Sequence, residues 1–280
     1  MSRLKRSTTV WIQGGLGNQL FQLNAGLTAS RRAGLPLLVS RSSYWRDSLR
    51  GFSLRPLLDS IQLTSHFEDV IVGPPHHRAG GVRTTTARLG VPITQSIEAA
   101  AEGPSLMVGY FQDQESLFGG TDEVQRLLGS IVIDDRYLAT RDLVAGRPVA
   151  HVRRGDYVSL ESARRTFGLL GPAYYEEAFS LLGHPMKDAV FFTDDAEYVR
   201  EEFGVRRDQI IGRSDVKSDL QTLALMAHAG DLVIPNSTFS WWAAEQLASR
   251  GRVVAPARWF LDRDETQWPT RRGWLRVENK

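Results

Sequence analysis

The sequence contains no cysteine among its 280 residues. This absence excludes disulfide frameworks, zinc sites built on thiolates, iron–sulfur clusters and cysteine nucleophiles. The sequence also lacks an apolar run of about 18 residues, the length that a membrane-spanning helix requires. The apolar stretch 10–12 is too short for a secretory signal. We therefore expect a cytoplasmic protein, while Arg3, Lys5 and Arg6 leave peripheral contact with the inner face of the membrane open.

An excess of charge of one sign is also missing. The 34 Lys and Arg residues nearly balance the 32 Asp and Glu residues, which gives a formal net charge of +2. The basic pairs are scattered along the chain instead of forming one stripe, so they do not resemble the charged face of a nucleic-acid-binding protein. We therefore expect no nucleic-acid partner, although a local anion site is compatible with this pattern.

The second half of the sequence alternates short apolar runs with amphipathic segments. The expected strands are 148–153, 189–193, 209–211, 232–234 and 252–255, and the expected helices are 172–182, 197–203, 220–229 and 239–248. Apolar strands without alternation between polar and apolar residues are typical of a parallel sheet that helices cover on both faces. The pattern predicts a doubly wound α/β fold for this half.

The first half begins in the same way but then becomes less regular. Its clearest expected elements are a strand at 8–13, a helix at 18–33 and a strand at 36–40. Residues 73–105 are rich in Gly, Pro and Thr, which predicts a loop-rich insertion. The sequence Ala-Gly-Arg-Pro at 145–148 indicates a boundary, and we expect domains at 1–146 and 147–280.

A glycine-rich turn, Gly14-Gly-Leu-Gly-Asn-Gln19, separates the first expected strand from the first expected helix. Backbone N–H groups at the start of a helix favour an anion, and glycines let a ligand come close. The turn has Leu20 where a dinucleotide fingerprint has its third glycine, and it lacks the Lys-Ser/Thr ending of a P-loop. It is therefore either a site for a phosphate or a sugar, or only a tight turn.

A second motif, His151-Val-Arg-Arg-Gly-Asp-Tyr157, lies at the carboxyl end of an expected strand. Ligands bind at that edge in open α/β sheets. A guanidinium can hold a pyrophosphate with two hydrogen bonds while a nearby carboxylate orients it. The motif predicts an anion site, and the alternative is a structural Arg–Asp bridge.

Asp194 and Asp195 end another expected strand. Paired carboxylates can bind a divalent metal or a ribose, and an Asp before a helix commonly caps it. Capping by Asp195 is the more common role, and His76-His77 lacks the spacing of metal ligands. We predict no metal site.

Asn236, Ser237 and Ser240 follow the expected strand 232–234 at the start of a helix. Such a helix N-terminus at the binding edge favours an anionic ligand. The alternative is that the hydroxyl groups only cap the helix and that the neighbouring tryptophans only fill the core.

Taken in order, these motifs resemble the α-1,2-fucosyltransferase family, glycosyltransferase family 11, whose members transfer fucose from GDP-fucose. The resemblance covers most of the chain, in the segments 14–22, 109–112, 151–157, 192–195, 225–226 and 236–242. It implies an α/β, GT-B-like fold in which two Rossmann-like domains face a cleft. The N-terminal domain would lie on the acceptor side, and the C-terminal domain would bind the GDP-sugar.

The resemblance also implies an activity. It implies an inverting transfer of L-fucose from GDP-fucose to the 2-hydroxyl of a glycan galactose, without a metal or another cofactor, in surface polysaccharide synthesis or protein glycosylation. Two alternatives are a protein that binds a GDP-sugar without transferring it and a transferase that uses another GDP-sugar. The oligomeric state and the identity of the acceptor glycan are not predicted.

The resemblance assigns roles to individual residues. It implies that His151 contacts the guanine or the ribose, that Arg153 contacts the β-phosphate, and that Arg154 braces the loop with Asp156. Arg153 would stabilise the charge that develops on the departing GDP. The donor-binding residues that we expect are Asn18, His151, Arg153, Asp156, Asp194, Asp219, Asn236, Ser237 and Ser240.

Two positions depart from the family or are not fixed by it. Many relatives carry an acidic residue where this sequence has Thr222, and Asp219 lies about one helical turn earlier. An inverting transfer benefits from a carboxylate base. The similarity of the arginine motif to that of the α-1,6-fucosyltransferases implies Glu161, which matches the catalytic Glu of that group by its spacing after the motif. Asp113 and Glu115 are the rival bases.

The acceptor-binding residues are hardly visible in the sequence. Loops of the N-terminal domain supply acceptor pockets in this architecture. Its aromatic candidates are Tyr44, Trp45 and Phe52, which could equally belong to the core.

Overall fold

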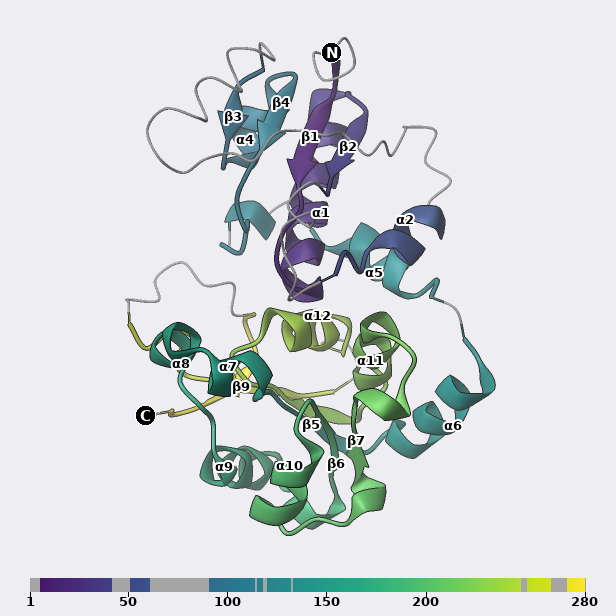
Figure 1. The fold of residues 1–280 in the computed structure, drawn as a ribbon, viewed down its shortest axis with the longest axis vertical. Coiled ribbons are helices and arrows are strands. Elements are labelled where there is room, and N and C mark those ends of the chain that lie inside the picture. Colours follow the sequence, from purple (N-terminus) through teal and green to yellow (C-terminus); the bar gives the residue numbers. More distant parts are fainter. Residues whose placement is uncertain are drawn as a thin grey trace. The chain divides into compact units, whose positions relative to one another are not determined.

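The computed structural model describes residues 6–41, 51–60, 91–113, 115–117, 120–131, 133–247, 251–262 and 271–279 (Figure 1). The chain forms two compact units, Met1–Ser130 and Ile131–Lys280. We expected the boundary after residue 146, but the structure divides the chain before α6 (Asp135–Val144). This helix packs against α11 (Asp219–Met226), which assigns it to the second unit.

The first unit contains a parallel sheet with the order β2-β1-β4-β3. Its elements are β1 (Thr8–Trp11), α1 (Leu16–Ala33), β2 (Leu37–Ser40), α2 (Arg55–Ser60), β3 (Ile93–Thr94), α4 (Ile97–Ala101), β4 (Ser105–Met107), η3 (Glu115–Leu117) and α5 (Asp122–Leu128). The predicted first strand, first helix and second strand are therefore confirmed. Gly26 lets α1 approach the sheet, because a Cβ at this position would lie 3.0 Å from side-chain atoms of Val10 and Leu37.

The expected loop-rich insertion at 73–105 is wrong in the part that the structure describes. Residues 61–90 lie outside the described residues, but β3 and α4 occupy most of 93–101. Ser96 caps α4 by accepting a hydrogen bond from the backbone N–H of Ala99, and Ile97 and Ala100 are buried. Short elements fixed by a cap and two or three buried side chains leave little periodic signal in a sequence.

The second unit contains a parallel sheet with the order β10-β9-β8-β5-β6-β7. Its strands are β5 (Pro148–Val152), β6 (Val190–Thr193), β7 (Ile210–Ile211), β8 (Asp231–Val233), β9 (Val253–Pro256) and β10 (Leu275–Val277). Its further helices are α7 (Gly155–Ser159), α8 (Glu161–Phe167), α9 (Pro172–Leu182), η4 (Met186–Asp188), α10 (Ala196–Glu202), η5 (Arg207–Gln209), η6 (Arg213–Asp215) and α12 (Thr238–Leu247). The predicted doubly wound α/β fold is confirmed, with one Rossmann-like sheet in each unit.

The core of the second unit explains why its pattern was readable. α9 begins with Pro172, ends at Gly183 in the left-handed conformation (φ 73°), and buries one face against the sheet. Trp241 and Trp242 in α12 are fully buried, so the interpretation of these tryptophans as core residues is confirmed. Within the described residues, none of the helices combines the length and apolar character needed to cross a bilayer.

Candidate functional site

The candidate site lies where the strand order of the second sheet reverses. β5 continues to β6 and β7 on one side, whereas β8, β9 and β10 lie on its other side (Figure 1). The loops after β5 and β8 therefore meet at the carboxyl edge, which is where ligands bind in open α/β sheets. Two tyrosines of α9 anchor the backbone at this edge. The Tyr175 hydroxyl donates to the carbonyl of His151 (3.0 Å), and the Tyr174 hydroxyl donates to the carbonyl of Ile234 (2.6 Å).

Arg153 and Asp194 form the ion pair of this edge. The Arg153 Nη1 atom lies 2.7 Å from Asp194 Oδ2, and the Asp194 carboxylate is only 5% exposed. Asp194 Oδ1 accepts hydrogen bonds from the backbone N–H groups of Arg154 (2.8 Å) and Gly155 (3.2 Å). Burial alone would raise the pKa of Asp194, but the charge of Arg153 and these backbone donors outweigh it and lower the pKa. An ionised carboxylate thus orients the Arg153 guanidinium.

Arg154 has different partners. Its Nε atom donates to Asp195 Oδ2 (3.0 Å), and its guanidinium lies 3.4 Å from the ring centre of Tyr198. We expected Arg154 to brace the loop with Asp156, whose side chain lies outside the described residues; the bracing groups that the structure shows are Asp195 and Tyr198. Asp195 also accepts from the backbone N–H of Tyr198, which confirms its predicted role as the cap of α10.

The two carboxylates at the end of β6 are thus committed to arginines and backbone donors. In the part of the chain that the structure describes, no three or more His, Asp or Glu side chains gather as a metal site would require.

His151 is buried at the end of β5. Burial, and then the charge of Arg153, lower its pKa to about 4, while Asp194 opposes this shift. The imidazole is therefore neutral at neutral pH, and its ring packs on Phe239 at 5.6 Å between ring centres. Among the described residues, its Nδ1 atom has no hydrogen-bond partner. A buried polar atom without a partner is costly, so this atom is a candidate contact for a ligand.

Asn236 joins three loops of the site. Its side-chain amide donates to the backbone carbonyls of Phe167, at the end of α8, and of Trp259, after β9. Its own carbonyl accepts from the Tyr157 hydroxyl (2.9 Å), and the Tyr157 ring stacks on Phe167 at 5.0 Å with an interplanar angle of 5°. Both amide hydrogens of Asn236 are thus used within the protein, so this residue positions the loops.

The two serines beside Asn236 are also buried. Ser240 is fully buried and its hydroxyl donates to the carbonyl of Ser237 (3.2 Å), as a residue in the first turn of a helix often does. Ser237 immediately precedes α12, whose first backbone N–H groups lie at the carboxyl edge of β8. The alternative role of Ser240 as a helix-start residue agrees with this geometry.

Asp219 and Thr222 lie on the first turns of α11. Ser218 caps this helix by accepting from the N–H of Gln221, and the Thr222 hydroxyl donates to the carbonyl of Ser218 (3.1 Å). Asp219 is exposed. Arg153 and Arg154, with the carboxylates of Asp194 and Asp195 that hold them, form an arginine cluster. Among the described residues, no hydrogen bond or ion pair joins Asp219 to Arg153 or His151, so the structure does not bring Asp219 into this cluster.

The three candidate bases differ in the hydrogen bonds that their carboxylates already make. Glu161 is exposed at the first position of α8, and among the described residues nothing pairs with it. Asp113 caps η3 with both oxygens, by accepting from the N–H (2.7 Å) and the hydroxyl (2.8 Å) of Ser116. The Glu115 side chain lies outside the described residues.

Asn18 lies in the first unit, at the start of α1. Its Oδ1 atom accepts from Gln112 Nε2 (2.8 Å), so the structure groups it with Gln112. Gly14 has φ 79°, and a Cβ there would lie 2.8 Å from Asn18 Nδ2. Position 14 therefore needs glycine for its conformation and for its contact with Asn18. Of the aromatic candidates in this unit, Phe52 is partly buried, and Tyr44 and Trp45 lie outside the described residues.

Sequence reasoning missed two contributors to the site. Tyr157 lies inside the arginine motif, and its hydroxyl could have been predicted to donate a hydrogen bond to a neighbouring loop. Arg213 follows β7 at the carboxyl edge, and its Nη2 atom lies 3.9 Å from Asp194 Oδ2. No signal in the sequence indicated Arg213, because its position depends on the pairing of β7 with β6.

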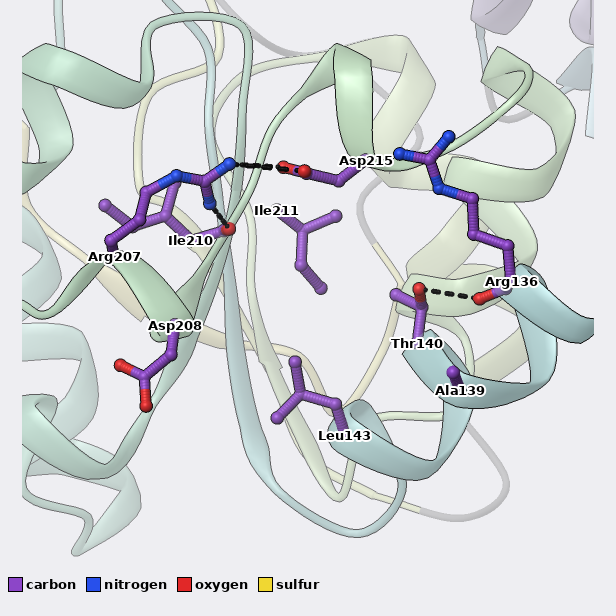
Figure 2. A pocket seen from close by; sticks show the side chains of 9 residues that line it. All are labelled: Arg136, Ala139, Thr140, Leu143, Arg207, Asp208, Ile210, Ile211 and Asp215. Atoms are coloured by element: carbon purple, nitrogen blue, oxygen red, sulfur yellow. Dashed lines mark hydrogen bonds and ion pairs between the residues drawn. The ribbon is translucent and has the colours of Figure 1, made fainter.

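A separate cavity of about 290 Å³ lies in the second unit between α6 and the edge strand β7 (Figure 2). Figure 2 shows Arg207 directed toward Asp215, to which it donates at 3.0 and 3.2 Å. None of the residues of the arginine cluster lines this cavity.

Comparison with known proteins adds three findings. The model of the family described as glycosyl transferase family 11 matches residues 98–278. The α-1,2-colitosyltransferase of Escherichia coli is 26% identical over 299 residues, which span 95% of this chain and 97% of that protein. The O-antigen biosynthesis glycosyltransferase WbnK of Escherichia coli is 23% identical over 292 residues, which span 91% and 96%.

Among solved structures, the fucosyltransferase NodZ from Bradyrhizobium matches with a TM-score of 0.44 at 16% identity. The match covers 85% of this chain and 92% of that one.

Proposed function

This chain belongs to glycosyl transferase family 11, and we propose that it transfers L-fucose from GDP-fucose to the 2-hydroxyl of a galactose that ends a glycan, without a metal ion. The observation that carries the proposal is the Arg153–Asp194 pair at the carboxyl edge of β5, where the strand order reverses. This is where an open α/β sheet binds a nucleotide, and a fixed guanidinium suits a diphosphate.

The transfer places its main electrostatic demand on the leaving group. The acceptor oxygen attacks the anomeric carbon of fucose, the bond to the β-phosphate breaks, and GDP leaves with the bonding electrons. The anomeric configuration inverts because attack and departure occur on opposite faces. Arg153, already oriented by Asp194, meets the additional negative charge on the β-phosphate, and the N–H groups at the start of α12 add to it.

We assign the contact with the nucleoside of GDP to His151. Its imidazole is neutral, so it can donate or accept a hydrogen bond without adding charge beside Arg153. The partnerless Nδ1 atom supports a contact with the ribose or the guanine of GDP.

The base is assigned to Glu161. It is the candidate carboxylate that is exposed and uncommitted among the described residues, and its helix is tied to the site through Phe167 and Asn236. In the reaction it accepts the proton of the acceptor hydroxyl as the new bond forms.

The identities of the donor sugar and of the acceptor are inferred from the names of two relatives. One of them is named as an α-1,2-colitosyltransferase, and colitose is fucose without its 3-hydroxyl group. A colitosyl donor is therefore the second candidate. The other relative is named for O-antigen biosynthesis, which supports a cell-surface glycan as the acceptor.

The test is GDP release from GDP-fucose, and separately from a colitosyl donor, with and without terminal β-galactosides and in the presence of EDTA. We expect acceptor-stimulated release with GDP-fucose that persists in EDTA, together with a fucosylated product whose linkage is read by NMR. Arg153→Ala should lower kcat by about 100-fold or more. Arg200→Ala is the matched control, because it removes an exposed arginine whose ion pairs in the described part of the chain are with neighbouring glutamates of α10. Release only with the colitosyl donor would replace fucose in the proposal, and loss of all release in EDTA would overturn the metal-free transfer.

A further inference from the structure

The first unit repeats the sheet geometry that positions the arginine cluster in the second. In its order β2-β1-β4-β3, β1 leads to β2 on one side and neighbours β4 on the other. The loops after β1 and β4 therefore share a carboxyl edge, the kind of edge at which such sheets bind ligands. A hydrogen bond from Gln112 Nε2 to Asn18 Oδ1 (2.8 Å) joins the loop after β4 to the first turn of α1, the helix that follows β1.

Buried glutamines of α1 fix these loops. Gln19 is fully buried and donates to the carbonyls of Gly14 and Gly51, both at 2.9 Å. Gln22 is fully buried and donates to the carbonyl of Gly109 (3.1 Å). Neutral amides organise the edge between β1 and β4, whereas arginines organise the corresponding edge of the second unit. These buried amides are engaged within the protein and add no charge to the edge, which suits an uncharged ligand better than an anion.

The loop after β4 presents one aromatic ring to solvent. Tyr110 is 49% exposed and is the only exposed aromatic side chain among the described residues. Its neighbour Phe111 has φ 52°, a left-handed conformation that is unusual for a bulky residue. Phe111 is buried and its ring lies against Gly109, since a Cβ at Gly109 would be 3.4 Å from it.

The strained backbone at Phe111 sends the side chains of residues 110 and 111 in different directions. The backbone at 111 directs the phenylalanine into the unit while Tyr110 faces outward between two anchored positions, Gly109 and Gln112. Backbone strain of this kind tends to be kept at ligand sites. An exposed tyrosine ring on an anchored backbone contributes contact area with little loss of side-chain entropy, because the side chain has only two rotatable bonds.

We propose that Tyr110 is a specificity-determining residue for the acceptor, and that its ring stacks on the apolar face of a terminal β-galactoside ring. The proposal rests on the proposed function, because it takes the galactoside as the second substrate. The ring, and not the hydroxyl, is the part that binds.

The test compares Tyr110→Ala and Tyr110→Phe with the wild type in transfer to a β-galactoside at saturating GDP-fucose. Loss of the ring should raise the acceptor KM about 10-fold, and Tyr110→Phe should restore it to within about 2-fold of the wild type. Leu181→Ala is the matched control, since Leu181 is a similarly exposed apolar side chain (48%) on α9. Acceptor-independent hydrolysis of GDP-fucose and the thermal shift with GDP should be unchanged in Tyr110→Ala, which also shows that the variant is folded.

A binding measurement separates failure of this proposal from failure of the proposed function. Saturation-transfer NMR with the β-galactoside, in the presence of GDP, needs no turnover and no particular donor. Signal that is strong in the wild type and in Tyr110→Phe, and lost in Tyr110→Ala, supports the role of Tyr110 even where GDP-fucose is the wrong donor. An unchanged acceptor KM and an unchanged NMR signal in Tyr110→Ala would overturn it. A wild type that transfers no saturation to any galactoside would also overturn it.

Discussion

The Tyr157 hydroxyl donates a hydrogen bond of 2.9 Å to the backbone carbonyl of Asn236. This bond connects the segment that follows the paired arginines with the segment that precedes α12. Because the Asn236 amide also binds the carbonyl of Phe167, the same two residues fix the helix that carries Glu161. The segment that follows the paired arginines and the helix that carries the candidate base are thus connected by one set of hydrogen bonds.

Tyr157→Phe tests this connection. The variant removes one hydrogen bond but keeps the stacking on Phe167, so we expect a loss of about 1 kcal/mol, equivalent to about 5-fold in kcat/KM. Tyr157→Leu also removes the stacking and should lower kcat/KM further. Steady-state kinetics with both substrates, together with thermal unfolding, measure the effect. Equal kcat/KM in Phe and Leu variants would show that the stacking does not position the site.

Asp194→Asn tests the orientation of Arg153. The amide keeps the size of the side chain but loses the charge that holds the guanidinium, so kcat should fall more than the KM for GDP-fucose rises. We expect the variant to lose about 1–3 kcal/mol of unfolding free energy, less than for a fully buried pair because Arg153 is partly exposed. Asp208→Asn, at an exposed ion pair with Arg206, is the control and should leave both kcat and stability unchanged.

His151 predicts a pH dependence of stability. Its folded pKa is about 4, below the ordinary value of 6.5, so between these values the unfolded chain binds more protons than the folded one. Stability therefore rises with pH through this window and is lost as pH falls from 6.5 toward 4. Thermal unfolding between pH 4 and 7 measures the slope. His151→Asn, which has no titrating group, should show a shallower slope than the wild type, and an identical slope would contradict the assigned pKa.

Gly14→Ala tests the turn of the first unit. Alanine is strained at φ 79°, and its Cβ would lie 2.8 Å from Asn18 Nδ2. We expect a loss of more than about 1 kcal/mol in unfolding free energy and displacement of the Asn18 side chain. Gly183→Ala, which has a similar φ of 73° but nothing within 4 Å of the added Cβ, separates the backbone strain from the contact. A smaller loss in Gly14→Ala than in Gly183→Ala would exclude the contact with Asn18.

The second unit was predictable because its strands are buried on both faces. Val190–Thr193 and Val253–Pro256 consist of buried residues without polar alternation, and α9 buries a regular apolar face. The first unit was less readable after its second strand, because the described elements there are short: α2 has six residues and α4 has five. β3 has only two residues, too few for any periodicity.

The residues of the site were easier to find than their partners. The sequence placed His151 and Arg153 correctly at the end of β5, because strand ends are local features. Arg154 pairs with Asp195, which follows β6, and Asn236 pairs with Trp259, which follows β9. Such pairs depend on strand order, which the chain does not display locally. Arg213 enters the cluster for the same reason.

The anchoring of the loop after β4 has a consequence for the diversity of acceptors. Its hydrogen bonds involve the carbonyl of Gly109 and the side chain of Gln112, and neither depends on which side chain stands at position 110. Substitution there alters the exposed surface while the supports stay in place. Position 110 is therefore where a saturation library should shift acceptor range with the least damage to folding.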